Sequence, residues 1–233
     1  MLFSATLPTD VADLARASVK DPVQVTIGKS ATPAERAEQA LHHTTREDKT
    51  KLLLTLLGQD RDSVLVFTRT KHGADRLGRA LGNAGHKVAV IHGDRSLSQR
   101  RGALEGFRRG TFRVLVATDV AARGIDVANI GHVVNYDMPN TPEDYVHRIG
   151  RTARVKASGR ATSFITADDH VQLRAIEKLL GQPIPRAAGS AAPAHSAQPA
   201  HNQRHNGQRD ARPGRPSGFR PRRPAHARSS HGA

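Results

Sequence analysis

Short apolar runs recur along the chain, and in most of them apolar residues do not alternate with polar ones. Runs of this kind are typical of strands that are buried on both faces of a sheet. We therefore predict strands within five runs, at residues 63–68 (SVLVFT), 87–92, 112–118, 132–137 and 161–166.

The segments between these runs have helical spacing and helix-terminal residues. The expected helices are 49–58, 71–85, 96–110 and 141–154. Ser96 is a suitable N-cap, and Thr141 is followed by Pro142 at the first helical position. Gly85 and Gly110 are suited to the helix ends. Strands that alternate with helices at this spacing predict an α/β fold with a doubly wound parallel sheet, of five or six strands, within residues 31–184.

Four polar segments follow the predicted strands, and they mark where a ligand should bind. In a doubly wound sheet, ligands bind beyond the carboxyl ends of the strands. These segments are TRTK (68–71), HGDRS (92–96), TDVAARGIDV (118–127) and the start of the helix after Asp137. We expect them to meet at one edge of the sheet.

The segment HRIGRTAR (147–154) concentrates one histidine and three arginines. If the segment is helical, His147, Arg151 and Arg154 share one face, and the two guanidinium groups form a clamp for one anion. Arg148 points elsewhere and has no assigned role. The alternative is a solvated basic face, but the neighbouring polar loops favour an anion site.

The segment 118–127 also has features of a binding loop. Thr118 and Asp119 fall at the end of a predicted strand, and Gly124 allows a ligand to approach the backbone. Asp126 is suited to accepting hydrogen bonds from ribose hydroxyl groups. Ordinary turn chemistry explains the Asp and Gly residues equally well when this segment is taken alone.

Composition limits the classes of protein and partner. The chain has 233 residues and a net charge of +15, which favours a polyanionic partner, nucleic acid before an anionic membrane. Cysteine is absent, which excludes disulfides and thiolate sites. We find neither an apolar run long enough to cross a membrane nor a secretion signal, so a cytoplasmic protein without membrane contacts is expected.

Residues 185–233 differ in composition from the rest of the chain. They hold nine of the 36 Lys and Arg residues but one of the 21 acidic residues, and Phe219 is their only aromatic residue. We predict a disordered Arg/His/Pro/Gly-rich basic tail, since so few apolar residues cannot offset the entropy of ordering. The tail is either a tether for RNA or DNA or a solubilising linker.

Six segments, in order, resemble the motifs of DEAD-box RNA helicases. They are FSATLP (3–8), VLVFTRTK (64–71), HGD (92–94), VLVATDVAARGID (114–126), VNYDMP (134–139) and HRIGRTAR (147–154). The resemblance covers about residues 1–180. It implies a RecA-like helicase C-terminal domain at 31–184, with the end of a first RecA-like domain and a linker at 1–30.

The resemblance also implies a role for each motif residue. Arg151 and Arg154 resemble arginine fingers that reach the ATP γ-phosphate, and His147 is similar to the residue that couples to the Ser-Ala-Thr motif. Asp126 and Gly124 match ATP-binding positions, and Ser4 and Thr6 match residues that couple the two domains. The positions that match contacts with the RNA backbone are Thr70, Gly93, Arg100, Thr118 and Asp119.

The sequence also departs from the family pattern. Leu97 stands where the family has glutamine, which leaves Arg100 as the remaining RNA contact of that motif, and Ala153 replaces a glycine. The chain contains neither a P-loop nor a DEAD sequence, which an ATPase needs for phosphate and magnesium. ATP and Mg²⁺ are therefore expected at a site shared with a missing N-terminal RecA-like domain that holds the magnesium ligands.

These observations support three hypotheses. In the first, the chain is the C-terminal half of an ATP-dependent RNA helicase, inactive in isolation. In the second, it is a non-enzymatic, truncated RNA-binding module that uses the RecA-like body and the basic tail. In the third, it belongs to a helicase of DNA repair or restriction, which HRIGR together with ATDVAARGID disfavours.

Overall fold

A computed structural model describes residues 9–19, 23, 25, 37–59, 61–122, 130–152 and 159–187 of this chain. Within these ranges, no helix has both the length and the apolar character that crossing a membrane requires. Helix α1 (Thr9–Ser18) is described by itself, and all other elements belong to one α/β body.

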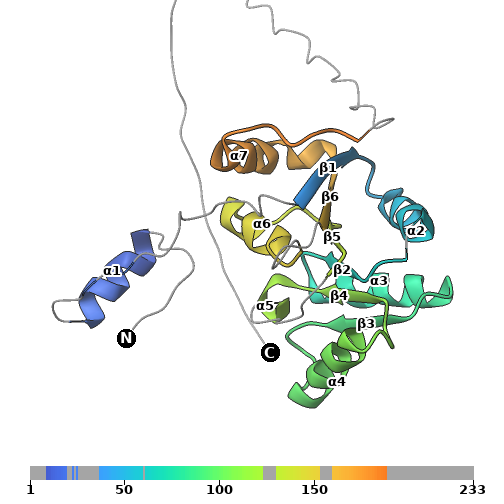
Figure 1. The fold of residues 1–233 in the computed structure, drawn as a ribbon. Helices are drawn as coiled ribbons and strands as arrows, with labels where there is room; N and C mark the ends of the chain where they lie inside the picture. Colours follow the sequence, from blue (N-terminus) through green and yellow to red (C-terminus); the bar gives the residue numbers. More distant parts are fainter. Residues whose placement is uncertain are drawn as a thin grey trace, which may run out of the picture. The chain divides into compact units, whose positions relative to one another are not determined.

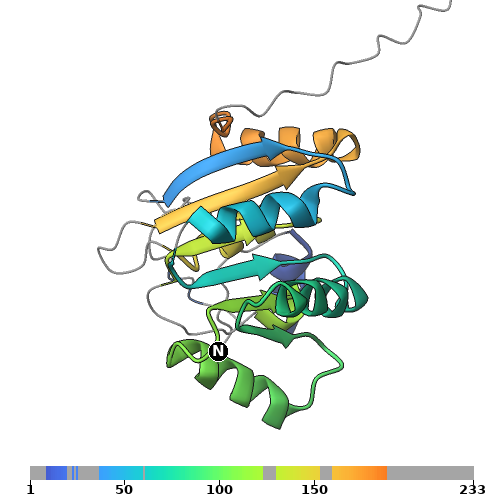
Figure 2. The ribbon, with the colours of Figure 1, turned by 90° about the vertical axis from the view of Figure 1, so that its right-hand side faces the viewer.

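A six-stranded, fully parallel sheet forms the centre of this body (Figures 1 and 2). Its strand order is β1-β6-β5-β2-β4-β3. The strands are β1 (Ala37–His43), β2 (Val64–Phe67), β3 (Val88–Ile91), β4 (Val114–Ala117), β5 (His132–Asn135) and β6 (Gly159–Ile165). Every residue of β2 and β4 is buried, as their continuous apolar runs predicted, and every residue of β5 is buried although His132 and Asn135 are polar.

Helices cover both faces of the sheet (Figure 1). The helices are α2 (Lys49–Gln59), α3 (Lys71–Asn83), α4 (Leu97–Arg108), α5 (Asp119–Ala122), α6 (Pro142–Ile149) and α7 (His170–Leu180), with a 3₁₀ turn at Ala167–Asp169. Helices α2 and α3 pack on Val64 and Val66 of β2. Helices α4 and α5 pack on Leu65 and Phe67, on the opposite face. Helices α6 and α7 share a further core with β1 and β6.

The predicted fold class and the five predicted strands are confirmed. Ser96 caps α4 in a capping box with Gln99, and Thr141 caps α6 ahead of Pro142. Gly85 and Gly110 both have positive φ where the chain leaves a helix. Strand β1, in which Leu41 is the one fully buried residue, and helix α7 were not predicted. The domain limits at residues 30/31 and 184/185 stay predictions.

The helix predicted at 141–154 is shorter in the structure. Helix α6 ends at Ile149 with Gly150 as its C-cap. The chain then turns, and Thr152 forms a bridge with Ile130 while its hydroxyl donates to the Ile130 carbonyl at 2.5 Å. The prediction that the helix continues to residue 154 was therefore wrong, and His147 and Arg151 do not lie on one helix. Arg154 lies outside the described residues.

The strand order brings the expected loops to one edge. Strand β2 lies between β4 and β5. From β2 the chain passes β4 to reach β3, and from β4 it returns past β2 to reach β5, so the direction of the connections reverses at this point. The segments after β2, β4 and β5 therefore start side by side at the carboxyl edge, which is where a doubly wound sheet binds its ligands.

Candidate functional site

Arg148, which the sequence left without a role, is the centre of the site. Its Nε donates to Asp119 Oδ1 at 2.6 Å, and its Nη2 donates to Asp119 Oδ2 at 2.7 Å. Its side chain is 2% exposed. This bidentate pair joins the last turn of α6 to the first residue of α5, and thus links two of the motif segments.

The other groups around Arg148 complete its environment. Nη1 donates to Asn135 Oδ1 at 3.1 Å and to the Asp137 carbonyl at 2.7 Å. The guanidinium lies over the Phe67 ring, 4.9 Å from its centroid. A buried cation needs such a set of partners. Removing its charge from water costs free energy, which an opposite charge and hydrogen bonds to its donors must offset. Arg148 therefore holds the ends of β2, β4 and β5 in one arrangement.

A small hollow lies beside this network. It has a volume of about 40 Å³ and is lined by Phe67, Asp119, Ala122, Asp144, His147, Arg148 and Arg151. His147 and Arg151 thus line the same hollow, although they do not share a helix. Arg148 is committed to Asp119, and Arg151 is the other arginine among the lining residues. The hollow is large enough for part of a ligand such as one anionic group, and far smaller than a whole nucleotide.

The predicted RNA-contacting residues lie at the carboxyl edge on four segments. Thr70 caps α3 and accepts a hydrogen bond from Gly73 N at 3.0 Å. Gly93 is exposed in the turn after β3, and Arg100 on α4 donates to the Ala121 carbonyl at 3.4 Å. Thr118 is 9% exposed at the end of β4. The Asp119 carboxylate accepts both hydrogen bonds of the bidentate pair with Arg148.

Ion pairs join the start of α3 to the turn after β3. Lys71 Nζ lies 2.8 Å from Asp94 Oδ2. Asp75 pairs with His92 Nε2 at 3.1 Å and Arg95 Nη2 at 2.7 Å. Partial burial opposes ionisation of Asp75, but hydrogen bonds and charge from His92 and Arg95 hold its pKa below the usual value. These contacts keep the segments that carry Thr70 and Gly93 side by side.

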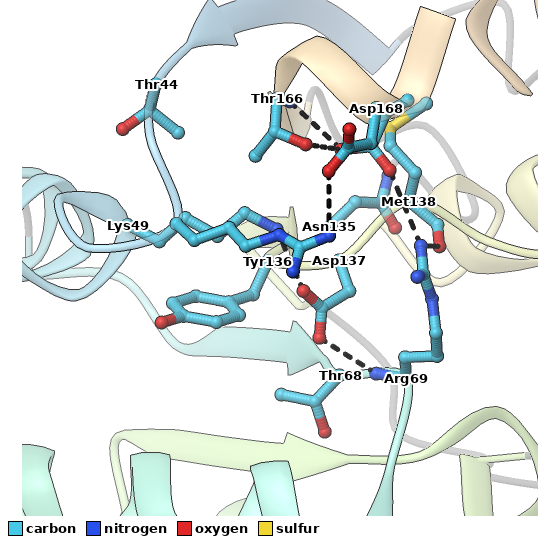
Figure 3. Close-up of polar contacts among 12 residues, drawn as sticks. Thr44, Lys49, Thr68, Arg69, Asn135, Tyr136, Asp137, Met138, Thr166 and Asp168 are labelled. Atoms are coloured by element: carbon cyan, nitrogen blue, oxygen red, sulfur yellow. Dashed lines mark hydrogen bonds and ion pairs between the residues drawn. The ribbon is translucent and has the colours of Figure 1, made fainter. Parts of the chain in front are cut away.

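A second, larger groove of about 750 Å³ lies at the same edge, on the α2/α3 side. Figure 3 shows its polar network. Lys49 Nζ lies 2.8 Å from Asp137 Oδ1, and the Arg69 backbone N donates to Asp137 Oδ2 at 3.0 Å (Figure 3). The Arg69 side chain donates to the Met138 carbonyl and to Asp169 Oδ1, both at 3.4 Å. The network fixes the segments after β2, β5 and β6 to the start of α2.

Five predicted site residues lie outside the described residues: Ser4, Thr6, Gly124, Asp126 and Arg154.

Sequence reasoning missed Arg148, Asp137 and Lys49. Arg148 did carry a signal, since it lies three residues after Tyr145, on the buried side of α6 with Ile149. A charged residue at a core-facing position indicates a buried ion pair.

Comparisons with known proteins agree with this geometry. Residues 48–156 match the model of the helicase conserved C-terminal domain. The ATP-dependent RNA helicase RhlB of Shewanella sp. (strain MR-4) is 41% identical over 186 residues, which are 79% of this chain and 42% of RhlB. The E. coli DEAD-box protein SrmB, in its crystal structure bound to regulator of ribonuclease activity A, has 35% sequence identity to this chain, and the two folds superpose with a TM-score of 0.64. That comparison covers 69% of this chain and 98% of the solved SrmB chain.

The chain belongs to the DEAD-box helicase family. It is a C-terminal helicase domain with the RecA-like fold, and it spans less than half the length of the curated RhlB protein that it matches. The fold is also similar to S. cerevisiae Dbp5 L327V bound to RNA and ADP BeF3, with 33% identity and a TM-score of 0.72. That comparison covers 79% of this chain and 50% of the Dbp5 chain.

Proposed function

We propose that this chain is the second RecA-like domain of an ATP-dependent RNA helicase, and that it supplies an arginine finger and part of the RNA-binding surface. The observation that carries the proposal is the hollow at the carboxyl edge, in which His147 and Arg151 lie beside the Arg148–Asp119 pair. The sequence resemblance assigns Arg151 and Arg154 to the γ-phosphate, and the position of Arg151 is consistent with that role.

The size of the hollow supports a shared ATP site. A space of about 40 Å³ accepts an anionic group presented from outside but does not enclose a nucleotide. No group of three His, Asp or Glu side chains suited to a metal ion occurs among the residues that the structure describes. We therefore assign the Mg²⁺ ligands, and most of the ATP contacts, to a first RecA-like domain. Bound Mg²⁺ would neutralise phosphate charge there.

In this proposal, domain closure completes the reaction site. Closure would bring Arg151 to the γ-phosphate, where a guanidinium stabilises the charge that develops during phosphoryl transfer. Arginine fingers contribute about 10³–10⁵ to the rate in related phosphoryl-transfer systems. His147, which lines the same hollow, would couple the arginine to the first domain. The proposal keeps the roles that the resemblance implies for four further residues. These are ATP binding for Asp126 and Gly124, and coupling of the two domains for Ser4 and Thr6.

The proposed RNA surface consists of Thr70, Gly93, Arg100 and Thr118, with Asp119 as a positioning residue that holds Arg148. Contacts of this kind with phosphates and sugars give little sequence preference. The bound RNA of the Dbp5 structure supports an RNA partner for this fold. The RNA, the ATP and the first domain are the three partners of the proposal.

The test is Arg151→Ala in a protein that joins this chain to an upstream RecA-like domain with a P-loop and a DEAD sequence. We expect RNA-stimulated ATP hydrolysis to fall by about 10³ or more, while the variant still folds and unfolds cooperatively in urea. Arg174→Ala, at an exposed position on α7, is the matched control. ATP hydrolysis within about twofold of the control in Arg151→Ala would reject the finger role.

The non-enzymatic hypothesis makes a different prediction for the same proteins. If the chain is only an RNA-binding module, joining the first domain adds no ATP hydrolysis that depends on Arg151. RNA binding would then be salt-sensitive and indifferent to ATP. Substituting single-stranded DNA for RNA as the stimulating strand distinguishes a helicase that acts on DNA.

A further inference from the structure

The 750 Å³ groove is separate from the arginine hollow and has no role in the proposed reaction. It lies between the first turns of α2 and α3 and the segments after β5 and β6. Thr70 lines this groove and is also a proposed RNA contact. The groove therefore continues the RNA surface away from Gly93 and Arg100, over the α2/α3 side of the edge.

Two of the groove's three acidic side chains are used inside the fold. Asp137 pairs with Lys49, whose side chain is 8% exposed. Asp169, whose side chain is 7% exposed, accepts hydrogen bonds from Thr166 N at 2.9 Å and Thr166 Oγ1 at 2.7 Å. The cations of Lys49 and Arg69 offset the negative charges of Asp137 and Asp169, respectively.

The solvent-facing lining is mainly arginine. Arg69 has a half-exposed side chain, and Arg76 is exposed and has no hydrogen-bond or ion-pair partner among the described residues. Arg46 pairs with Asp168 at 2.7 Å, with side chains 74% and 69% exposed. Such an exposed pair contributes little free energy, so Arg46 can exchange Asp168 for another anion at low cost.

We propose that this groove binds the sugar-phosphate backbone of single-stranded RNA and extends the RNA track beyond Thr70. Arg46 and Arg76 hold phosphates, because guanidinium groups match phosphate oxygens in charge and in bidentate geometry. Tyr136 does not stack on a base here, since Lys49 lies over its ring and Phe164 packs beside it. The extension is therefore indifferent to base sequence. It rests on the proposed function, in which Thr70 contacts RNA.

The test measures binding of oligouridylates of about 6 and about 20 nucleotides to the full 233-residue chain. For Arg46→Ala/Arg76→Ala, we expect affinity for the longer RNA to fall about tenfold at low salt and the slope of log K against log salt to shrink by about 1.4. The loss for the shorter RNA is smaller, because it can occupy the Gly93–Arg100 surface alone. The matched control is Arg79→Ala/Arg174→Ala, which removes two exposed arginines outside the groove.

Each outcome decides the proposal. An equal loss in the control variant would mean general electrostatic attraction and would overturn the groove as a site. Unchanged RNA affinity in Arg46→Ala/Arg76→Ala would also overturn it, and would leave the groove to a different occupant such as an acidic peptide. A failure of the proposed function would give a different result from a failure of the groove proposal. If the chain has no RNA surface at Arg100, Arg100→Ala would leave the affinity for both RNAs unchanged.

Discussion

Arg148 and Asp137 connect the two sites at the edge of the sheet. The Asp137 carbonyl accepts a hydrogen bond from Arg148 Nη1 at 2.7 Å, on the side of the arginine hollow. The Asp137 carboxylate faces the groove, where it binds Lys49 and the Arg69 backbone N (Figure 3). One residue thus belongs to both networks.

Arg148→Ala tests how much the buried pair contributes to stability. Removing one partner leaves the Asp119 carboxylate uncompensated, and breaking a buried pair costs about 3–5 kcal/mol of the free energy of unfolding. Urea denaturation measures this loss. Arg109→Ala breaks an exposed pair with Glu105 and is the control, with an expected loss within about 0.5 kcal/mol. A loss below about 1 kcal/mol for Arg148→Ala would contradict the account.

His132 predicts a pH dependence of stability. Burial, with a smaller contribution from His42, lowers the pKa of His132 to about 4, and its Nε2 lies 2.8 Å from Thr162 Oγ1. In the unfolded chain the pKa is about 6.5. Between these values the unfolded chain binds more protons, so stability is full above about pH 6.5 and falls as the pH drops towards 4.

The expected loss between pH 7 and pH 5 is about 2 kcal/mol, from the two pKa values. Urea midpoints of the wild-type chain and of His132→Gln at both pH values measure it. His132→Gln keeps a hydrogen-bonding group for Thr162 but cannot be protonated. Between pH 7 and pH 5, its free energy of unfolding should therefore change by about 2 kcal/mol less than that of the wild-type chain. The same pH dependence in both proteins would assign the effect to other groups.

Gly78 sets how closely α3 packs on the sheet. A Cβ atom at this position would overlap Val90 Cγ2 of β3, so we expect Gly78→Ala to cost about 1–3 kcal/mol. Gly82→Ala is the control on the same helix, where an added Cβ meets no atom within 4 Å. That variant should be more stable by up to about 1 kcal/mol, from helix propensity. Adding Val90→Ala should reduce the cost of Gly78→Ala, and a purely additive result would refute the steric explanation.

Leu97 stands where the family has glutamine, and a single substitution restores the family residue. It is the first residue of α4, is 68% exposed and lies one turn before Arg100. Leu97→Gln adds a donor for an RNA phosphate, and one neutral hydrogen bond of about 0.5–1.5 kcal/mol should raise RNA affinity by about 2- to 12-fold. Leu97→Met is the control that keeps an apolar side chain. Equal affinities for both variants would show that position 97 does not contact RNA.

The sequence predicted the sheet because β2 and β4 are buried on both faces and carry unbroken apolar runs, and β5 holds the apolar pair Val133 and Val134. Strand β1 was missed, since its one fully buried residue is Leu41 and pairing with β6 decides its conformation. At the site, His147 and Arg151 were placed together correctly, but for a reason that the structure corrects. The end of α6 depends on Thr152 bonding to Ile130, a contact across 22 residues that local spacing cannot reveal.

The most direct test of the central claim is RNA-stimulated ATP hydrolysis by the 233-residue chain alone and by the chain joined to an upstream RecA-like domain with a P-loop and a DEAD sequence. The account predicts no RNA-stimulated hydrolysis by the isolated chain. It predicts hydrolysis by the joined protein that Arg151→Ala reduces by about 10³ or more. Robust hydrolysis by the isolated chain, or hydrolysis by the joined protein that is indifferent to Arg151, would contradict it.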